Sequence, residues 1–317
     1  GGLRACGQPE QPRRRAGRLP GVDVQEVVTS LGGVTTRAAL VAATTRRDVD
    51  VALRSGAIVR LARDRYALPS ADEAVTRAHA VGGVLCLTSA ALHHGWAVKH
   101  VPVEPHVCLP RGRKLAMQRS AGIQLHRRDL TPDDISGIAT SRAATLLHCL
   151  RSLPFDEALC VADSAARDGE LALLRRVAQE ARGAGAAKVR RVAALARAEA
   201  DNPFESCLRA IAGEVPGLAV EPQLTITSVT PHVRPDLVDR ELGVILEADS
   251  FGWHGDRVAL RRDARRYDLL VADGWLVLRF AWEDVMFDPE FVRGILVAVV
   301  ALAQRRTEVL CPRCGAA

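Results

Sequence analysis

The hydrophobic and polar positions near the start of the chain predict three short helices followed by a hairpin. Over residues 22–56, apolar residues recur at helical spacing in three stretches, which are separated by glycines and by threonines that can cap a helix. Over residues 57–69, apolar and basic residues alternate about a turn at Arg63–Asp64, as in paired strands. Three helices and a two-stranded wing predict a winged helix-turn-helix domain over residues 21–69.

The pattern changes twice further along the chain. Residues 70–200 predict a mixed α/β region that ends in consecutive helices, and residues 201–303 alternate between helical and strand patterns. In the second region, LTITSV at residues 224–229 and the apolar stretches after it predict the strands of a mixed sheet. We therefore expect an α+β multidomain protein. The longest apolar run, Ile295–Leu302, is too short to span a membrane, so we expect no membrane partner.

The charge of the chain is unevenly distributed. The chain has 43 Lys and Arg against 37 Asp and Glu, a formal net charge of +6. Residues 1–20 hold five of the Arg and one of the Glu, which leaves 38 basic and 36 acidic side chains in the rest. We expect residues 1–20 to be a disordered basic tail, because they are rich in Gly, Pro and Arg. Nucleic-acid binding therefore has to be argued from local patches.

Cysteine usage, together with the lack of an apolar leader in residues 1–20, predicts a cytoplasmic protein. Six of the eight Cys have no regular spacing, which is typical of a reducing compartment. The other two form a CPRC motif, Cys311 and Cys314, in a tail over residues 304–317. Because a structural zinc takes four ligands and no second pair is near, we expect an exposed thiol pair there and not zinc, unless two chains share a site.

The third predicted helix and the wing carry the candidate DNA-binding residues. Side chains at the start of such a helix can reach base edges in the major groove, and Arg suits guanine and phosphate. The alternative is a solvated helix face in a protein whose basic residues are nearly all Arg. We expect this segment to bind double-stranded DNA at the nucleoid. The candidates are Thr45, Arg46, Arg47 and Arg54 on the helix and Arg60, Arg63 and Arg65 on the wing.

Several stretches of the first half resemble a known family. TTRRDVDVALRSGAIVRLARDRYALP, LTSAALHHGW, VCLPRGRK and SRAATLLHCL are similar to the antitoxin and transcriptional-regulator proteins of the AbiE type (AbiEi). The resemblance covers about residues 21–180. It implies a winged helix that binds operator DNA through the Arg46–Arg54 helix, and an AbiEi-like middle region over residues 70–200. A toxin is one expected partner, and a homodimer is the alternative, since winged helices often bind paired half-sites.

Three carboxylates interrupt the strand pattern between residues 234 and 254. If residues 240–243 form a hairpin turn, Asp236 lies opposite Glu247, and Glu247 and Asp249 share one face of their strand. Like charges opposite each other on a sheet are destabilising, and a divalent cation removes that conflict. We therefore expect Mg²⁺, or Mn²⁺, bound by Asp236 and Glu247, with Asp249 as a third catalytic acid, and hydrolysis of phosphodiester bonds as the chemistry.

Other candidate residues surround these acids. His254 follows the Asp249 strand closely and could activate water or protonate a leaving group. Glu205 has two interpretations: after Asn202 and Pro203 it falls at the third position of a helix, where it would cap, and it would also be a fourth catalytic acid. The next helix carries four Arg that could hold a DNA backbone: Arg261, Arg262, Arg265 and Arg266.

This order of acids and histidine resembles the PD-(D/E)xK nuclease superfamily, in particular the branch related to very-short-patch-repair (Vsr) endonucleases. The similarity lies in NPFESCLR, RPDLVDRELGVILEADSFGWH and RRDARRYDLLVADGWLVLRFAWEDV, over about residues 201–300. It implies a restriction-endonuclease-like α/β/α core, with Asp236 at the PD position, Glu247 at the (D/E) position and His254 as the histidine after the strand. Asp249 stands where the superfamily has Lys, and would be a metal ligand or orient His254.

Two functions follow from these patterns. The first is a Mg²⁺-dependent DNA endonuclease that is targeted by a winged helix. The second is an AbiE-type antitoxin or transcriptional regulator with a catalytically inactive nuclease fold, which the missing Lys and the regulator-like first half favour. Action on RNA ranks below both, because the chain has only two Tyr, six Phe and four Trp with which to stack unpaired bases.

Overall fold

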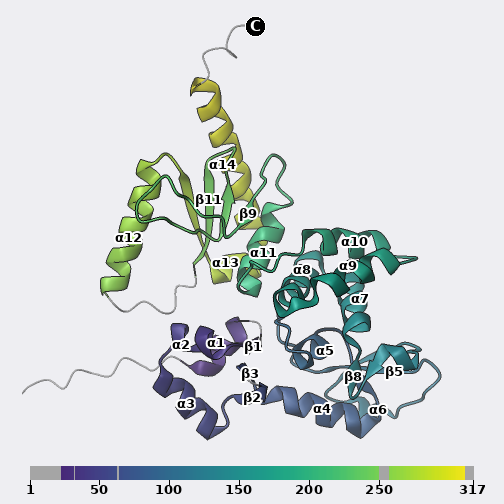
Figure 1. Cartoon of the computed structure of the whole chain (residues 1–317). Helices are drawn as coiled ribbons and strands as arrows, with labels where there is room; N and C mark the ends of the chain where they lie inside the picture. Colours follow the sequence, from purple (N-terminus) through teal and green to yellow (C-terminus); the bar gives the residue numbers. More distant parts are fainter. Residues whose placement is uncertain (1–22, 32, 63, 250–256, 311–317) are drawn as a thin grey trace, which may run out of the picture.

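The structure is a computed structural model that describes residues 23–31, 33–62, 64–249 and 257–310. It is a mixed α+β protein with three small sheets (Figure 1). We call the described parts of residues 23–69, 70–200 and 201–310 the N-terminal, middle and C-terminal units. None of the described helices has the length and apolar character needed to cross a membrane. The predicted tail and four predicted residues lie outside the described part: residues 1–20, Arg63, His254, Cys311 and Cys314.

The N-terminal unit has three short helices and a small antiparallel sheet. Its elements are α1 (Val24–Ser30), β1 (Val34–Thr35), α2 (Arg37–Ala43), α3 (Arg46–Ser55), β2 (Val59–Ala62) and β3 (Arg65–Ala67). The side chains of Asp23, Thr36 and Thr45 accept hydrogen bonds from the first turns of the three helices. Strand β3 lies between β1 and β2, and the helices share one core with Ile58 and Tyr66. The predicted order of three helices and a hairpin is confirmed.

The middle unit joins a five-stranded sheet to a group of helices. Its elements are α4 (Ser70–Val81), β4 (Val84–Leu85), α5 (Leu87–His93), β5 (His106–Leu109), α6 (Met117–Ser120), β6 (Gln124–Arg127), η1 (Pro132–Asp134), β7 (Ile135–Ser136), β8 (Ala139–Thr140), α7 (Arg142–Ser152), α8 (Phe155–Ala165), η2 (Ala166–Glu170), α9 (Leu171–Glu180) and α10 (Ala186–Leu195). The strand order is β6-β5-β4-β8-β7. Helices α5 and α7 to α10 bury one apolar core, which includes Trp96, Leu146 and Leu159.

The C-terminal unit is a four-stranded mixed sheet with helices on both faces. Its elements are α11 (Pro203–Ala212), β9 (Glu221–Pro222), β10 (Leu237–Asp239), β11 (Val244–Asp249), α12 (Arg257–Ala272), β12 (Leu276–Ala281), α13 (Trp282–Phe287) and α14 (Pro289–Leu310). In the order β12-β11-β10-β9, only the β11–β12 pair is parallel. Leu246 packs in the core with α11 and α14. Its neighbour Ile245 packs with Leu270 of α12, so alternate residues of β11 face opposite helical layers.

The strand predicted at residues 224–229 is wrong. Gln223 has a φ of +56°, so the backbone leaves the extended conformation directly after β9. Beyond it the segment makes one isolated bridge, between Ile226 and Val233. Ile226 and Val229 are nevertheless buried in the core that contains Ile245. The alternation that indicated a strand therefore reflects a loop that packs on the sheet.

Helix α8 connects the middle and C-terminal units. It packs directly on α11 (Figure 1). Asp163 of α8 is fully buried. Its Oδ2 accepts hydrogen bonds from Oγ of Ser206 at 2.7 Å and from Nη2 of Arg209 at 2.5 Å, both on α11. This buried ion pair fixes the direction of α11, and with it the position of Glu205 at the start of that helix.

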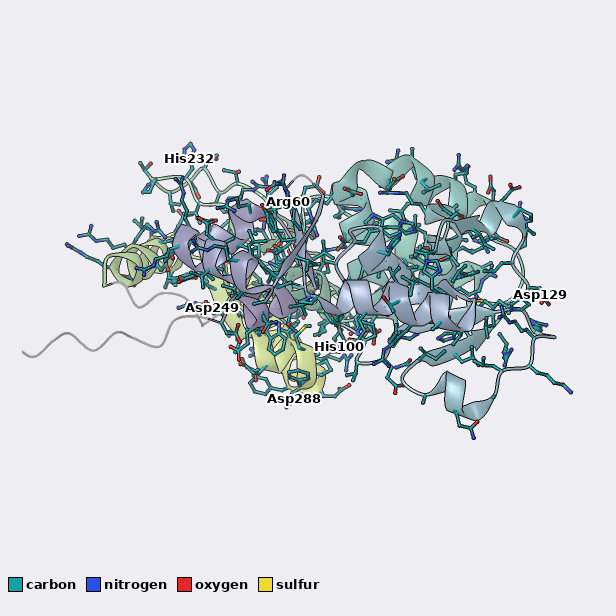
Figure 2. All side chains as sticks on the ribbon, turned by 90° about the horizontal axis from the view of Figure 1, so that it is seen from below. Arg60, His100, Asp129, His232, Asp249 and Asp288 are labelled. Carbon is teal, nitrogen blue, oxygen red and sulfur yellow. The ribbon has the colours of Figure 1, made fainter. Side chains whose placement is uncertain are left out.

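The start of α11 also lies beside the N-terminal unit. Residues of β1 and α2 line a hollow of about 440 Å³ together with Asp201 and Asn202, which precede α11. A second contact joins the middle unit to α13, where His100 stacks on Phe287 with 6.2 Å between ring centroids. Figure 2 shows His100 and Asp288 near each other at this contact. The N-terminal unit therefore lies beside the start of α11, and the middle unit contacts α13, which follows β12.

Candidate functional site

The hairpin between β10 and β11 brings two predicted acids together. Leu237 pairs with Leu246, so the next position sets Asp236 opposite Glu247, as the sequence predicted. Oδ2 of Asp236 accepts a hydrogen bond from the backbone N of Ala248 at 2.8 Å. The charge of Asp236 in turn acts on Glu247 and adds to the rise in its pKa.

Glu205 lies near this pair, at the start of α11. Oδ1 of Asn202 accepts a hydrogen bond from the backbone N of Glu205 at 3.1 Å, which makes Glu205 the third residue of a capped helix. Its carboxylate accepts from the backbone N of Asp201 at 3.0 Å and from Nδ2 of Asn202 at 2.9 Å. The same carboxylate accepts a hydrogen bond from the side chain of Gln223, which also donates to Asp236. The two interpretations of Glu205 are thus compatible, because it occupies a capping position and borders the predicted site.

Gln223 has no counterpart among the predicted site residues, yet it lies between two acids. Its Nε2 donates to Oε2 of Glu205 at 3.1 Å and to Oδ1 of Asp236 at 3.3 Å. Its backbone N donates to the carbonyl O of Asp236 at 2.9 Å. Positive φ is uncommon in residues other than Gly, and such strain concentrates at functional sites. A single Gln outside any motif carries no sequence signal, so only the folded register reveals it.

We call Glu205, Asp236 and Glu247 the acid cluster. Glu205 and Glu247 are only 6% and 5% exposed. Burial, followed by the charge of Asp236, raises the pKa of Glu205 to about 8 and that of Glu247 to about 8. Burial also raises the pKa of Asp236, against hydrogen bonds that favour its ionised form. The acid cluster is therefore partly protonated near neutral pH, and its proton content responds to any nearby positive charge.

Arg266 of α12 supplies positive charge to this cluster. It forms an ion pair with Glu247, and its charge opposes the rise in the pKa of Glu247. The sequence assigned Arg266 to DNA backbone binding together with three other residues of α12. Those three are exposed on the helix: Arg261, Arg262 and Arg265. The structure thus separates Arg266 from the other arginines by its contact with the acid cluster.

Asp249 lies at the end of β11, outside the acid cluster. It forms an ion pair with Arg279 of the neighbouring strand β12. Arg279 stacks over the ring of Tyr267, with 4.4 Å from its guanidinium carbon to the ring centroid. Figure 2 labels Asp249 on the ribbon. At the position where the resembling superfamily has Lys, this chain therefore has an acid that is neutralised by a guanidinium from the adjacent strand.

The acid cluster suits a divalent cation in part. Asp236 and Glu247 offer two adjoining carboxylates, which are the hard oxygen ligands that Mg²⁺ and Mn²⁺ prefer. Burial raises the pKa of both groups, and the charge of Asp236 adds to the rise for Glu247, so a bound cation would favour their ionised forms. Within the described part of the chain, however, no three His, Cys, Asp or Glu side chains are grouped as a ready metal site. Asp236 and Glu247 would supply two ligands, so a bound cation would need water for the rest of its coordination shell.

The predicted DNA-binding residues of the N-terminal unit are largely exposed. Thr45 caps α3: its Oγ1 accepts from the backbone N of Asp48 at 3.2 Å and donates to Oδ2 of Asp48 at 2.7 Å. Its hydroxyl is thereby occupied. Arg63 and the side chain of Arg65 lie outside the described part of the structure. The exposed arginines of α3 and β2 are Arg46, Arg47, Arg54 and Arg60.

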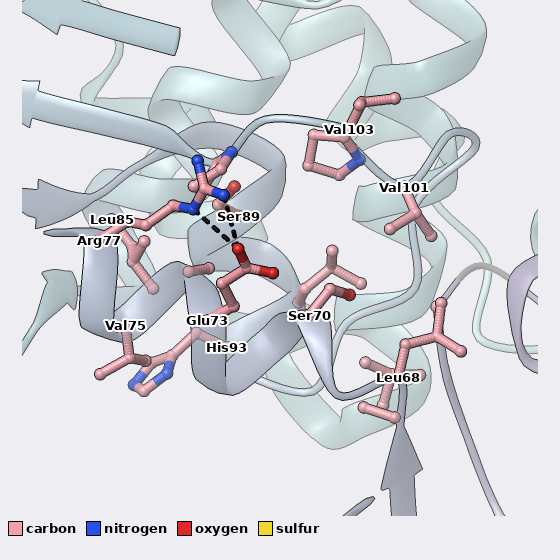
Figure 3. A pocket seen from close by; sticks show the side chains of 17 residues that line it. Leu68, Ser70, Glu73, Val75, Arg77, Leu85, Ser89, His93, Val101 and Val103 are labelled. Carbon is pink, nitrogen blue, oxygen red and sulfur yellow. Dashed lines mark hydrogen bonds and ion pairs between the residues drawn. The ribbon is translucent and has the colours of Figure 1, made fainter. Parts of the chain in front are cut away.

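A separate cavity lies between the N-terminal and middle units, away from all these residues. It has a volume of about 230 Å³ and mostly apolar walls (Figure 3). An ion pair between Glu73 and Arg77, 2.6 Å apart, crosses one wall. None of the predicted catalytic or DNA-binding residues lines this cavity.

Comparison with known proteins gives one distant similarity. The chain is 26% identical over 271 residues to an uncharacterized protein of Mycobacterium tuberculosis, found in two strains. The match covers 81% of this chain and 96% of the relative. No family model matches the chain. The similarity extends over all three units but attaches no activity to them.

Proposed function

We propose that this protein is a DNA-binding, metal-dependent endonuclease. In this proposal the N-terminal unit is a winged helix that binds double-stranded DNA. The C-terminal unit is a nuclease of the PD-(D/E)xK kind, related to the Vsr branch, and its layered sheet is the restriction-endonuclease-like core. Three helices with an antiparallel hairpin support the first assignment, and a mixed sheet between helices supports the second.

The observation that carries the proposal is the imbalance of charge in the acid cluster. The amide of Gln223 joins Glu205 and Asp236, the strand register sets Glu247 opposite Asp236, and only Arg266 forms an ion pair with any of the three within the described residues. Buried like charges are costly unless they are neutralised. Proteins retain such arrangements where an ion or a substrate completes them, and perturbed carboxyl groups are a common mark of catalytic sites.

Each residue of the cluster has a distinct role in this proposal. Asp236 and Glu247 would hold Mg²⁺ or Mn²⁺, which polarises a phosphoryl oxygen and makes bound water more acidic. Glu205, with a pKa of about 8, can accept or release a proton near neutral pH. Arg266 orients the carboxylate of Glu247. The exposed arginines of α12 lie on the same helix and would contact the DNA backbone.

A regulator without nuclease activity is the second candidate. Two observations favour it: Asp249 replaces the usual Lys and is paired with Arg279, and Glu247 is paired with Arg266. In an AbiE-type antitoxin or transcriptional regulator, these ion pairs would stabilise an inactive nuclease fold that serves as a partner surface. DNA binding by the N-terminal unit is common to both candidates, so cleavage is the property that separates them.

The test is cleavage of plasmid and duplex oligonucleotides with Mg²⁺ or Mn²⁺. We expect cleavage by the intact chain, and a loss of at least about 100-fold in rate in Asp236→Ala and in Glu247→Ala, because each removes a metal ligand. EDTA should abolish cleavage. Glu241→Ala, which removes an exposed acid from the turn of the same hairpin, is the matched control and should cleave normally.

Binding to the same duplex is measured in parallel. Retained binding by the Asp236→Ala and Glu247→Ala chains would show that only the chemistry is lost. Salt-sensitive binding by the intact chain without any cleavage would favour the regulator. Cleavage that survives both substitutions would contradict the assignment of the acid cluster.

A further inference from the structure

Two helices of the middle unit lie in a segment with a clear excess of positive charge. Residues 171–200, which contain α9 and α10, carry seven basic and two acidic side chains, a net charge of +5. Residues 201–303 carry 10 basic and 17 acidic side chains, a net charge of −7. The region with the acid cluster thus repels polyanions overall, whereas the α9–α10 hairpin attracts them.

The basic side chains of this hairpin are not neutralised within the described residues. None of the seven forms an ion pair there. Arg182, Arg190 and Arg197 donate to backbone carbonyl groups, which carry no net charge. Arg191 stacks over the ring of Phe155 at 4.4 Å. By contrast, ion pairs hold Arg266, Arg279 and Arg293 of the C-terminal unit: their partners are Glu247, Asp249, Glu214 and Glu290.

Three of these arginines line one open hollow. The hollow has a volume of about 430 Å³ and lies between α9, α10 and the segment that follows α10. Its lining includes Arg175, Arg190 and Arg197, together with Gln179 and a single acid, Glu199. The three arginines are exposed. Exposed guanidinium groups lining one hollow are suited to bind phosphate oxygens.

The hairpin is fixed to the helix that carries Glu205. The backbone N of Arg197 donates to Oδ1 of Asp163 at 2.8 Å. The other oxygen of Asp163 holds α11 through Ser206 and Arg209. In Figure 1, α8 lies between α11 and the α9–α10 hairpin. One buried carboxylate therefore couples the position of the basic surface to that of the acid cluster.

We propose that the exposed face of α9 and α10 binds the phosphate backbone of double-stranded DNA, independently of sequence. The hairpin supplies the electrostatic attraction that the acidic C-terminal unit lacks, and it adds to the contacts of the N-terminal unit. Phosphate contacts of this kind raise affinity and salt dependence without reading bases. This inference rests on the proposed function in that DNA is the substrate.

The experiment measures the affinity of the full chain for a short duplex as salt is varied. In the variant Arg175→Gln/Arg190→Gln, we expect the slope of log Kd against log salt to fall by about 2, since each phosphate contact contributes about 0.9. Two duplexes of unrelated sequence should be affected alike. The matched control, Arg111→Gln/Lys114→Gln, removes the same charge from an exposed loop of the middle unit and should keep the slope.

Each other outcome contradicts the inference. Equal slopes for the hairpin variant, the control and the unchanged chain would show that the hairpin does not contact DNA. If the hairpin variant binds DNA normally but loses self-association or a protein partner, the surface binds protein instead. Should the double variant fold poorly, Arg175→Gln alone replaces it, because no hydrogen bond or ion pair of Arg175 occurs among the described residues, and its slope should fall by about 1.

The cleavage assay separates this inference from the proposed function. A hairpin-dependent slope in a chain that never cleaves would uphold the DNA surface and reject the endonuclease. Cleavage by the intact chain, together with a slope that the hairpin variant does not change, would uphold the endonuclease and reject the DNA surface on α9 and α10.

Discussion

Two buried acidic sites in this molecule, the single carboxylate of Asp163 and the acid cluster, differ in their partners. Asp163 on α8 is fully buried, and its two oxygens accept hydrogen bonds from Arg197, Ser206 and Arg209. Burial raises the pKa of Asp163, while the charge of Arg209 and these hydrogen bonds oppose the rise. Every strong acceptor position is thus filled by a donor from the protein itself.

The acid cluster differs in its balance of charge. Its carboxylates accept hydrogen bonds too, and Glu205 and Asp236 share the amide of Gln223. Arg266 is the one ion-pair partner of the three acids among the described residues. A buried acid with a full set of donors stabilises the fold, because its removal leaves those donors unsatisfied. A cluster with more carboxylates than cations opposes folding until something else supplies charge. This contrast distinguishes a structural joint from a candidate site, and it can be tested.

The largest expected effect of a substitution follows from removing the carboxylate of Asp163. Asp163→Ala leaves the guanidinium of Arg209 buried without a counter-ion, so the free energy of unfolding should fall by about 3–5 kcal/mol. Chemical denaturation of the full chain measures this. Asp163→Asn keeps the shape and part of the hydrogen bonding, and should lose less. Glu205→Gln is the comparison from the acid cluster.

Glu205→Gln should change the free energy of unfolding by less than about 1 kcal/mol at pH 8, or raise it, because it removes one of the adjoining charges. If Glu205→Gln is as destabilising as Asp163→Ala, the distinction between the two groups fails. The acids of the cluster would then be structural as well.

Some positions in the acid cluster could be predicted from the sequence because they depend on local geometry. Asp236 opposite Glu247 was predictable, because a turn at residues 240–243 and the two-residue period of strands fix the register. Glu205 was placed by local capping chemistry after Asn202. Both depend on short-range rules, which the order of residues along the chain expresses directly.

The contacts that the sequence did not predict depend on distant segments. The left-handed backbone of Gln223 ended the expected strand at residues 224–229 and turned its amide toward two acids. The ion pair of Arg266 with Glu247 requires α12 to pack on a particular face of the sheet, and Arg266 was predicted to face DNA. Asp163, which joins α8 to α11 and to the segment after α10, lies in no motif at all. Such contacts arise from tertiary packing, which residue spacing does not encode.

The next effect is on metal affinity. Gln223 orients Glu205 and Asp236 from outside the proposed pair of ligands, and loss of such supporting contacts typically weakens metal binding by 10 to 100-fold. We expect Gln223→Ala to weaken Mn²⁺ binding by about 10 to 100-fold, measured by calorimetric titration. Folding should be retained, because no apolar core is opened.

Gln223→Gly separates the amide from the backbone. Gly adopts positive φ without strain, so this chain should be at least as stable as Gln223→Ala and should bind Mn²⁺ as weakly. Mn²⁺ binding equal to that of the unchanged chain in both variants would show that the amide does not organise the acid cluster. Normal binding in Gln223→Gly alone would assign the effect to the backbone.

A further effect is the dependence of stability on pH without metal. The pKa values of Glu205 and Glu247 are about 8 in the folded chain, against an ordinary value of 4.5. Between these values the folded state binds more protons than the unfolded state, so the free energy of unfolding falls as pH rises from about 5 to 8 and then levels off. In EDTA we expect the melting temperature to fall by at least about 2–4 °C over this range.

The matched variant for this measurement is Glu205→Gln, which cannot titrate at that position and should show a flatter profile. Adding Mn²⁺ at pH 8 should restore the melting temperature of the unchanged chain, because a cation favours the deprotonated carboxylates. A profile that is identical in the unchanged chain and in Glu205→Gln would mean that the pKa of Glu205 is not raised in the folded chain, and Glu205 would then not belong to the acid cluster.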